Sequence, residues 1–395
     1  MLPLEGYRVI DCSQVFAGPG TAMYLADLGA DVIKVERPGG EDCRNLDTSP
    51  FLGRDSRPFM ALNRNKRGIV VDITKPQGAD VIRRMSARAD VFIENFTLGT
   101  ADRLGIGYDD LRAGNPRLIY ASVTGFGLKG PYAPRAAYDL IVQGLSGIAE
   151  VRRDPSGRPM PAPLWVSDCS APMLMAYGIT AALLQREKTG VGQRVETSLF
   201  AAAIAMQSTF LVRVPDDPAE GARAASQATY QPYRCSDGTY INVVILNERQ
   251  WRNLCRILEI EHLADDPDFN TVQKRSERTA ELFPLLEGLF ESRPAAEWVE
   301  LLSAAQIPCG PIISRARVYD EPQVLENDLL VDVQHPTAGP TRILGFPLKL
   351  SDANLTVRRP APRIGQHTDE VLADYGFGSQ QIAELRAAGV LGGSS

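Results

Sequence analysis

The sequence predicts an α/β protein with a Rossmann-like, doubly wound large domain and a smaller α+β domain. Three observations support this fold class. Apolar segments typical of buried strands alternate with helical segments over residues 8–123. The pattern breaks down into Pro, Ala, Gly and charged residues at 213–229, and a strand followed by several helices comes after the break. At 395 residues the chain is also long for one hydrophobic core. We assign 1–212 and 325–395 to the large domain and 226–324 to the small one.

The first elements form a strand, a helix and a second strand within about thirty residues, which is typical of a parallel sheet. Residues 8–12 predict a buried strand, 13–20 a loop and 21–28 a short helix, with Gly29 as the residue that follows the helix. The second strand is predicted at 31–36. The alternation continues with further strands at 67–73, 91–95 and 117–123 and a helix at 76–88.

The remaining segments complete the two domains. Residues 138–149 and 171–187 predict helices rich in small and apolar residues, which are buried or face another subunit. Residues 213–229 are interpreted as a linker. The small domain is predicted to hold a strand at 239–246 and helices at 247–259, 274–291 and 295–305. Short strands and two short helices are expected in 330–395.

Composition excludes several classes of function. The net charge of −6 argues against a nucleic-acid-binding protein, although a few local arginines are enough to bind an anion. The six cysteines are scattered without a Cys-x-x-Cys pair and the three histidines lie far apart, so we expect a reducing cytoplasm, no disulfide framework and no metal site. No apolar run reaches the length of a membrane span, so no membrane association is expected.

The segment 125-GFGLKG-130 matches the glycine pattern of dinucleotide-binding proteins. That motif requires a helix to begin at its third glycine, so that the helix N-terminus meets a pyrophosphate. Pro131 and Pro134 follow instead. The segment therefore predicts a glycine-rich turn that shapes a pocket.

Two basic features leave alternatives open. Arg37 follows Glu36 at the end of a predicted strand, where it either forms an exposed ion pair with Glu36 or contacts a phosphate. Arg64, Lys66 and Arg67 lie within 63-NRNKRG-68, which is either a solvated face or an anchor for a polyphosphate.

The segment 164-LWVSDCSAPMLMAYG-178 places Asp168 among small and apolar residues. Pro172 suits the first turn of a helix, so Asp168 or Ser170 could be the N-cap. Alternatively, the helix N-terminus could keep a buried Asp168 carboxylate ionised, as a nucleophile toward an activated acyl group. Helix rules alone favour the cap.

A set of motifs spread along nearly the whole chain resembles the class III CoA-transferases, the CaiB/BaiF family that includes formyl-CoA transferase and carnitine CoA-transferase-like proteins. These motifs are 17-AGP-19, 28-LGADVIKVERPGG-40, 63-NRNKRGIVVDI-73, 90-DVFIENF-96, 115-NPRLIYASVTGFG-127, 308-PCGPI-312 and 365-GQHTDEVL-372. The segment 165–183, followed by 189-TGVGQRVE-196, is similar to the active-site aspartate region of that family, and the matching aspartate is Asp168.

The resemblance implies that Asp168 is the catalytic residue of a CoA-transferase. Its carboxylate would form an anhydride with the acyl group of a CoA thioester and then a thioester with CoA, before CoA passes to an acceptor acid. Coenzyme A enters as the substrate thioester, and no metal is needed. The partners implied are an acyl-CoA donor, a carboxylic acid acceptor and a second copy of the chain, because the family forms an interlocked homodimer.

The resemblance also implies CoA contacts, position by position. Phe16 and Ala17 match a loop near the thioester, Arg37 an arginine on the nucleotide and Arg103 an arginine that binds phosphate. Val71, Asp72, Ile73 and Thr74 match a segment beside the adenine. The remaining contacts implied are Asn95, Phe96 and Thr97 on the pantetheine side, and Ala136, Ala137, Tyr138 and Asp139 after the glycine-rich turn.

Some positions depart from the family pattern. Phe16 stands where formyl-CoA transferases carry glutamine, and residues 226–238 lack their run of glycines, so a larger or more apolar acyl group than formate or oxalate is expected. Tyr138 occupies the place of the histidine base of α-methylacyl-CoA racemases, and a tyrosine is a poor base at neutral pH. A racemase-like enzyme is therefore a less favoured alternative. A non-catalytic CoA-binding protein is another, against which the presence of Asp168 argues. Arg135 or Lys129 could hold the second carboxylate of a dicarboxylic substrate.

Overall fold

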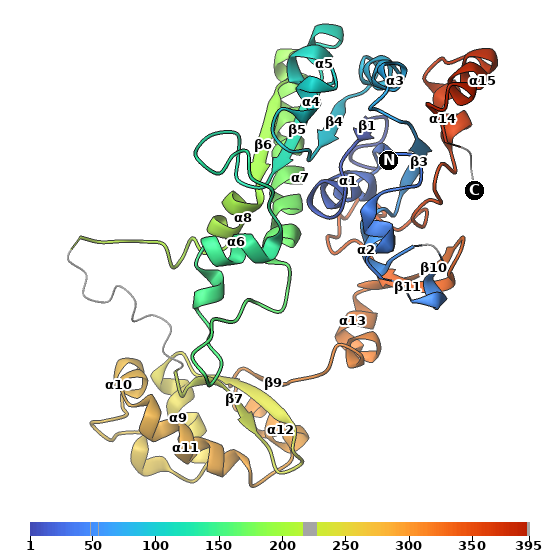
Figure 1. Cartoon of the computed structure of the whole chain (residues 1–395). Helices are drawn as coiled ribbons and strands as arrows, with labels where there is room; N and C mark the ends of the chain where they lie inside the picture. Colours follow the sequence, from blue (N-terminus) through green and yellow to red (C-terminus); the bar gives the residue numbers. More distant parts are fainter. Residues whose placement is uncertain (48, 54, 216–226, 393–395) are drawn as a thin grey trace. The chain divides into compact units, whose positions relative to one another are not determined.

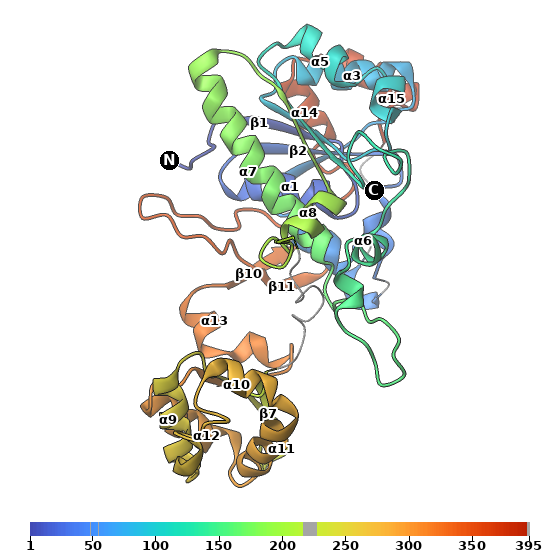
Figure 2. The ribbon, with the colours of Figure 1, turned by 90° about the vertical axis from the view of Figure 1, so that its left-hand side faces the viewer.

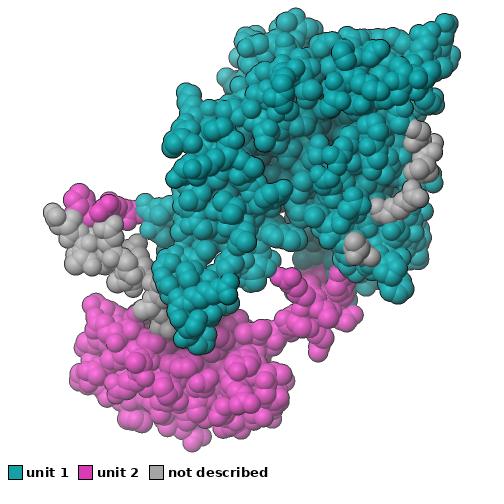
Figure 3. All heavy atoms as spheres, viewed as in Figure 1, with its two compact units in different colours: residues 1–211, 325–395 teal, residues 212–324 magenta. Residues whose placement is uncertain are grey.

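The computed structural model describes residues 1–47, 49–53, 55–215 and 227–392. The chain forms two compact units, coloured separately in Figure 3. The first contains residues 1–211 and 325–395 and the second residues 212–324. Figure 1 shows the ribbon of both, with its elements labelled.

The first unit is built on a six-stranded parallel sheet, which confirms the predicted α/β class. The strands lie in the order β3-β2-β1-β4-β5-β6. The direction of winding reverses between β1 and β4, which are neighbours in the sheet, and in such sheets ligands bind at the carboxyl ends of the strands flanking this point. The strand bounds are β1 Arg8–Asp11, β2 Asp31–Glu36, β3 Lys66–Val70, β4 Val91–Glu94, β5 Ile119–Thr124 and β6 Arg194–Ser198.

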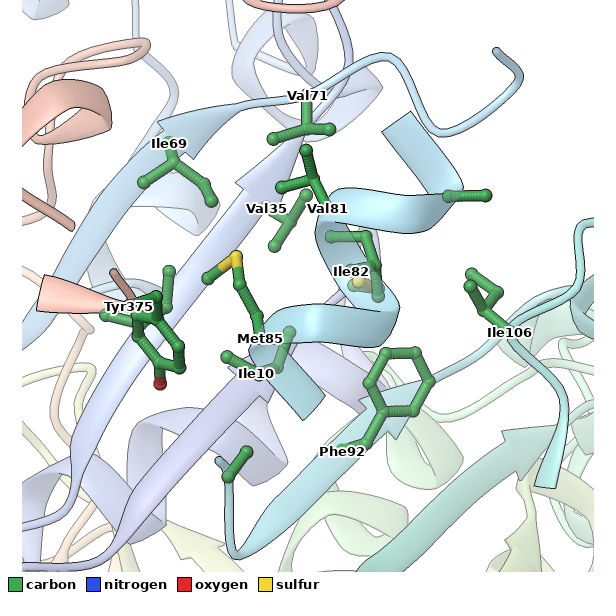
Figure 4. Close-up of a cluster of buried hydrophobic side chains, with 14 of the residues drawn as sticks. Ile10, Val35, Ile69, Val71, Val81, Ile82, Met85, Phe92, Ile106 and Tyr375 are labelled. Atoms are coloured by element: carbon green, nitrogen blue, oxygen red, sulfur yellow. The ribbon is translucent and has the colours of Figure 1, made fainter. Parts of the chain in front are cut away.

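Alternate residues of β1, β2, β4 and β5 enter two different hydrophobic cores, as the pleat requires. Val9 packs with helices α1 (Ala17–Asp27) and α7 (Val166–Thr189), which lie side by side on one face of the sheet (Figures 1 and 2). Ile10 points to the opposite face, where Figure 4 shows it with Met85 of helix α3. That face is covered by α3 (Pro76–Ser86), α5 (Tyr108–Gly114), α14 (Thr368–Asp374) and α15 (Ser379–Ala387).

Two helices of the first unit begin earlier than predicted. Helix α1 starts at Ala17 rather than residue 21, because Gly18 lets the helix approach Ser13 closely; a Cβ at this glycine would lie 2.1 Å from the Ser13 Cβ. Helix α7 starts at Val166 rather than residue 171, so Pro172 lies inside the helix and not in its first turn. Gly29 does follow α1, in a left-handed conformation with φ of 110°.

The second unit packs helices against a three-stranded antiparallel sheet. The strands are β7 (Tyr230–Arg234), β8 (Tyr240–Val244) and β9 (Cys309–Pro311). The buried ring of Trp251 lies within its core. Arg278 divides the predicted helix 274–291 in two, and the helices of this unit are α9 (Glu248–Ile257), α10 (Val272–Glu277), α11 (Thr279–Phe290) and α12 (Ala295–Ala304). Residues 216–226 of the predicted linker lie outside the described residues.

The shorter elements complete the chain. Strands β10 (Leu330–His335) and β11 (Gly339–Leu344) form an antiparallel hairpin. The remaining helices are α2 (Arg57–Leu62), α4 (Thr100–Arg103), α6 (Asp139–Leu145), α8 (Leu199–Ala205) and α13 (Pro322–Glu326). Among the helices of the described residues, none combines the length and apolar character needed to cross a membrane.

Candidate active site

A cavity of about 360 Å³ lies where the chain leaves β1, β4 and β5, beside the point where the winding reverses. Parallel α/β sheets bind their ligands at this place. Nine of the residues that the sequence predicts for the site line the cavity together: Phe16, Ala17, Asn95, Phe96, Thr97, Ala136, Ala137, Tyr138 and Asp168.

Asp168 is the third residue of α7 and does not cap it. The N-cap position belongs to Trp165, whose side chain makes no capping hydrogen bond. Asp139, from helix α6, supplies the missing acceptor: its Oδ1 accepts hydrogen bonds of 2.7 Å from both the N–H and the hydroxyl of Ser167. The prediction that Asp168 or Ser170 caps the helix was therefore wrong. The carboxylate of Asp168 faces the cavity instead.

Burial and the neighbouring carboxylate of Asp139 raise the pKa of Asp168 to about 7. The expected ionisation of Asp168 by the helix N-terminus is opposed first by burial and then by Asp139, which occupies that helix end and adds a second negative charge nearby. Asp139 itself is buried and also accepts a 2.6 Å hydrogen bond from Gln143 Nε2. Asp139 therefore supports the start of α7 and does not line the cavity itself.

The segment between β1 and α1 forms another wall of the cavity. Its backbone is tied to the loop after β4, since Gln14 N–H donates to Asn95 Oδ1 at 2.8 Å and Asn95 Nδ2 donates to the Gln14 carbonyl at 2.7 Å. The ring of Phe16 packs at 4.8 Å from the ring of Trp165, which precedes α7. In the described residues no side chain caps α1, so the N–H groups of its first turn stay available at the cavity.

Other predicted CoA contacts lie outside the cavity wall. Arg37 is exposed and pairs with Asp42, whose side chain does line the cavity. Glu36 is buried and pairs with Arg44 at 2.6 Å, so the alternative of an exposed Glu36–Arg37 pair was wrong. Arg103 donates to Thr100 Oγ1 at 3.1 Å, and the hydroxyl of Thr100 is in turn hydrogen-bonded to the hydroxyl of Thr97.

The segment Val71 to Thr74 follows β3 and packs partly against the C-terminal part of the chain. Val71 is buried in the core that contains α3, and the Asp72 N–H donates to the Val390 carbonyl at 2.8 Å. Ile73 is half-buried and Thr74 is exposed. The structure thus leaves only the end of this segment open to a ligand.

The basic cluster at 63–68 is neither a solvated face nor an anchor for a polyphosphate. Its three cations are buried and paired with acids of other elements, at 2.7 Å for Arg64–Asp27, 2.9 Å for Lys66–Asp11 and 2.7 Å for Arg67–Asp31. The cations therefore join strands and helices inside the first unit. Both interpretations of this segment were wrong, because the partner acids are distant in sequence.

Some residues of the cavity were missed at the level of sequence. Gln14, Val15 and Asp42 line it, as do Leu98, Val123, Ala133 and Leu199. The position of Gln14 and Val15 directly after β1 was a usable signal, since loops at carboxyl ends of parallel strands form the binding site. Arg135, considered for a second carboxylate, lines the cavity, whereas Lys129 does not.

Comparisons with known proteins all indicate one family. The model of CoA-transferase family III matches residues 4–368. The human succinyl-CoA:glutarate CoA-transferase is 36% identical over 395 residues, covering 98% of this chain and 90% of the relative. The formyl-CoA:oxalate CoA-transferase of Streptomyces avermitilis is 33% identical over 410 residues, covering 98% and 99%. The crystal structure of a CaiB/BaiF family protein from Brucella suis is 34% identical, with a TM-score of 0.81 and coverage of 95% and 99%.

Proposed function

The chain belongs to CoA-transferase family III and is an enzyme of that class, and we propose that Asp168 is the nucleophile with which it moves CoA from an acyl-CoA to a carboxylic acid. The observation that carries the proposal is the position of the Asp168 carboxylate. It is half-buried, faces the cavity at the switch point of the sheet, and accepts no capping hydrogen bond from its own helix. A carboxylate so placed can attack a thioester.

The proposed reaction proceeds through two kinds of covalent intermediate, an anhydride and a thioester of Asp168. The Asp168 carboxylate attacks the thioester carbonyl carbon, the C–S bond breaks, and a mixed anhydride and the CoA thiolate result. The thiolate attacks the Asp168 carbonyl, releases the donor acid and leaves a thioester between Asp168 and CoA. The acceptor carboxylate attacks the Asp168 carbonyl of this thioester, the C–S bond breaks, and a second mixed anhydride and the CoA thiolate result. The thiolate attacks the carbonyl carbon of the acceptor, which gives the new acyl-CoA and restores the Asp168 carboxylate. Each step exchanges acyl groups of similar activation, so no external energy source is needed.

Two features of the site suit this chemistry. A carboxylate whose pKa is raised is more nucleophilic once ionised than an ordinary carboxylate. The N–H groups at the start of α1, those of the N-cap residue Phe16 and of Ala17, belong to residues that line the cavity, where they could stabilise an oxyanion. We propose that Arg103 and Arg37 lie along the path that leads out from this centre past Thr97.

Incubation of the enzyme with succinyl-CoA and hydroxylamine tests the proposal. Hydroxylamine should convert the acylated Asp168 to a hydroxamate, which intact-mass and peptide analysis would locate. A panel of acyl-CoA thioesters and acids that gives neither hydroxamate nor CoA exchange would overturn it. Deuterium exchange at the α-carbon without CoA exchange would instead identify a racemase-like enzyme.

The rate of covalent capture should depend on pH through Asp168. Only the ionised carboxylate attacks, and its pKa is raised to about 7 by burial and by Asp139. We expect kcat/KM to rise with pH through about 7 and to fall about tenfold for each pH unit below it. A pH profile measured with a fixed acyl-CoA checks this. A profile that stays flat down to pH 5 would contradict the raised pKa of the nucleophile.

We propose that the substrates are dicarboxylic acids and their CoA thioesters. The name of the human relative gives succinyl-CoA and glutarate as its substrates. Among the described residues that line the cavity with Asp168, Arg135 alone carries a positive charge. Its guanidinium lies 4.3 Å from the centre of the Tyr132 ring, which orients it as a fork of donors. A guanidinium in this place can bind the carboxylate remote from the reacting one.

We also propose that the enzyme is a homodimer in which a second copy covers an apolar face of α6 and α7. Leu140, Ile141 and Leu145 of α6 and Met173, Tyr177 and Leu184 of α7 are all exposed. Clusters of this kind mark protein interfaces. Sedimentation of the purified chain at micromolar concentration should give the mass of two chains. A single-chain particle would show that this face serves another purpose.

A further inference from the structure

The segment that joins β1 to α1 is held in an unusual backbone conformation at the cavity wall. Val15 has a φ of 69°, in the left-handed region that β-branched residues strongly disfavour. Such a conformation persists only where surrounding interactions impose it. Val15 lines the cavity together with Asp168, and the residues after it begin α1. The conformation of Val15 therefore sets where the first-turn N–H groups of α1 point.

A buried glutamate holds Val15 in this conformation. The N–H of Val15 donates a 2.7 Å hydrogen bond to Oε2 of Glu41. The other carboxylate oxygen of Glu41 lies 3.1 Å from Nζ of Lys34 on β2, and both side chains are almost fully buried, at 1% and 0% exposure. A hydrogen bond from an amide to an ionised carboxylate is shorter and stronger than a neutral one.

Lys34 connects this contact to the rest of the segment. Its ammonium group also donates to the backbone carbonyl of Ser13. Burial lowers the pKa of Lys34, but the carboxylates of Glu41 and Asp11 more than offset this and leave the pKa raised. The lysine stays protonated, so Glu41 has a fixed positive partner on the side away from Val15.

The other anchors act on neighbours of Val15, among them Gln14, whose N–H donates to Asn95 and whose carbonyl accepts from it. Asp11 accepts from the Ser13 N–H at 3.1 Å, and Lys66 donates to the Pro19 carbonyl at 2.8 Å. The hydrogen bond to Glu41 is the one that acts on the strained residue itself.

We propose that Glu41, fixed by Lys34, is a positioning residue that holds Val15 in the left-handed conformation and thereby aims the first-turn N–H groups of α1 at the reacting carbonyl. The inference rests on the proposed function, because the oxyanion formed by attack of Asp168 is what these groups would stabilise. Glu41 itself does not line the cavity.

The variant Glu41→Asp tests the proposal. It keeps a negative charge beside Lys34, but its side chain is one methylene shorter and cannot reach the Val15 N–H from the same backbone position. Displacement of catalytic groups by about 1 Å lowers rates by up to about a hundredfold. We expect kcat to fall between about tenfold and a hundredfold, with the KM for the acyl-CoA within about threefold of wild type. The rate of hydroxamate formation should fall in parallel with kcat.

A second substitution distinguishes positioning from a general loss of structure. Glycine adopts positive φ without strain, so in the variant Val15→Gly the hydrogen bond to Glu41 should no longer be needed to keep this conformation. We expect Glu41→Asp to lower kcat less than about fivefold in the Val15→Gly background, which a double-mutant cycle would measure. Asp27→Asn, which breaks the buried pair with Arg64 at the far end of α1, serves as a control that lowers thermal stability without lowering kcat.

Two results would overturn the inference. In one, Glu41→Asp lowers kcat by the same factor in both backgrounds; in the other, it leaves kcat unchanged. Failure of the proposed function is a separate outcome, because then the wild-type enzyme itself forms no hydroxamate and exchanges no CoA.

Discussion

Replacement of Asp168 by alanine should lower kcat for CoA transfer by about 10⁴-fold or more. The reaction proposed has no other covalent carrier, so the variant must bring two acyl groups together without an enzyme-bound intermediate. Water cannot replace the carboxylate productively, because its attack on the thioester hydrolyses the substrate. Transfer measured by mass spectrometry of CoA exchange should fall to background, and the hydroxamate should disappear from the peptide that contains residue 168.

The next residue offers a matched control. Cys169 is exposed, follows Asp168 directly in α7 and does not line the cavity. Cys169→Ala should keep both transfer and the hydroxamate. Transfer that survives in Asp168→Ala at more than about a hundredth of the wild-type rate would show that another residue carries the acyl group.

The stability of a third variant, Asp168→Asn, reports on the free energy that the buried charge of Asp168 costs the folded state. The pKa of Asp168 is raised on folding to about 7, from an ordinary value of 3.8. Protonated Asp168 therefore favours the folded state below pH 3.8, and this contribution is lost as the pH rises through 7. Asp168→Asn should thus have a higher Tm than wild type at pH 8 and a smaller advantage at pH 5. This result would also show that the variant loses activity without unfolding.

The core of the large domain was predictable because its pattern is local. Val9 and Ile10 are both apolar, as a strand buried on both faces requires, and they enter the two cores on opposite sides of the sheet. The order of the strands was not fixed by any such pattern. It depends on which helices cover which face, and the parallel partners of β1, at Asp31 and Val91, lie far apart in sequence.

The wrong predictions for charged residues have a common physical cause. Lys66 and Arg64 look solvated in sequence, because nothing near them indicates that Asp11 and Asp27 will arrive from β1 and α1. The start of α7 was missed for the same reason. Its cap is Asp139, which is remote in sequence from Ser167, whereas Asp168 and Ser170 are the nearest residues of suitable type. Long-range pairing is not visible to rules that use local spacing.

The site was identified by family resemblance more than by local chemistry. The local sequence around Asp168 favoured a role as helix cap, whereas the family motifs along the chain indicated a nucleophile. The strained Val15 could not have been found in either way, since valine carries no sequence signal for a positive φ. Residues that fix a catalytic segment without lining the cavity, such as Glu41, can be identified only from the structure.

The choice of acid should depend on Arg135. Arg135→Ala is expected to lower kcat/KM for succinate or glutarate by about a hundredfold relative to the monocarboxylic acids of the same length, butyrate and valerate. The reason is the loss of charge-assisted hydrogen bonds to the remote carboxylate, which contribute about 1.5–3 kcal/mol. Arg135→Lys should restore part of the preference, because an ammonium keeps the charge but not the fork of donors. Competition between paired acids for one CoA thioester measures the ratio directly.

Lys129 is the control for nonspecific charge at the same loop. It is exposed, lies on the segment that leads to Arg135 and does not line the cavity, so Lys129→Ala should leave the preference unchanged. If Arg135→Ala lowers transfer to dicarboxylic and monocarboxylic acids by the same factor, Arg135 binds a phosphate of CoA rather than the acid. A preference for monocarboxylic acids in the wild-type enzyme would contradict the proposed substrate class. Because only the ratio between acids of equal length is compared, changes in stability or in CoA affinity cancel, and the result reports on the remote carboxylate alone.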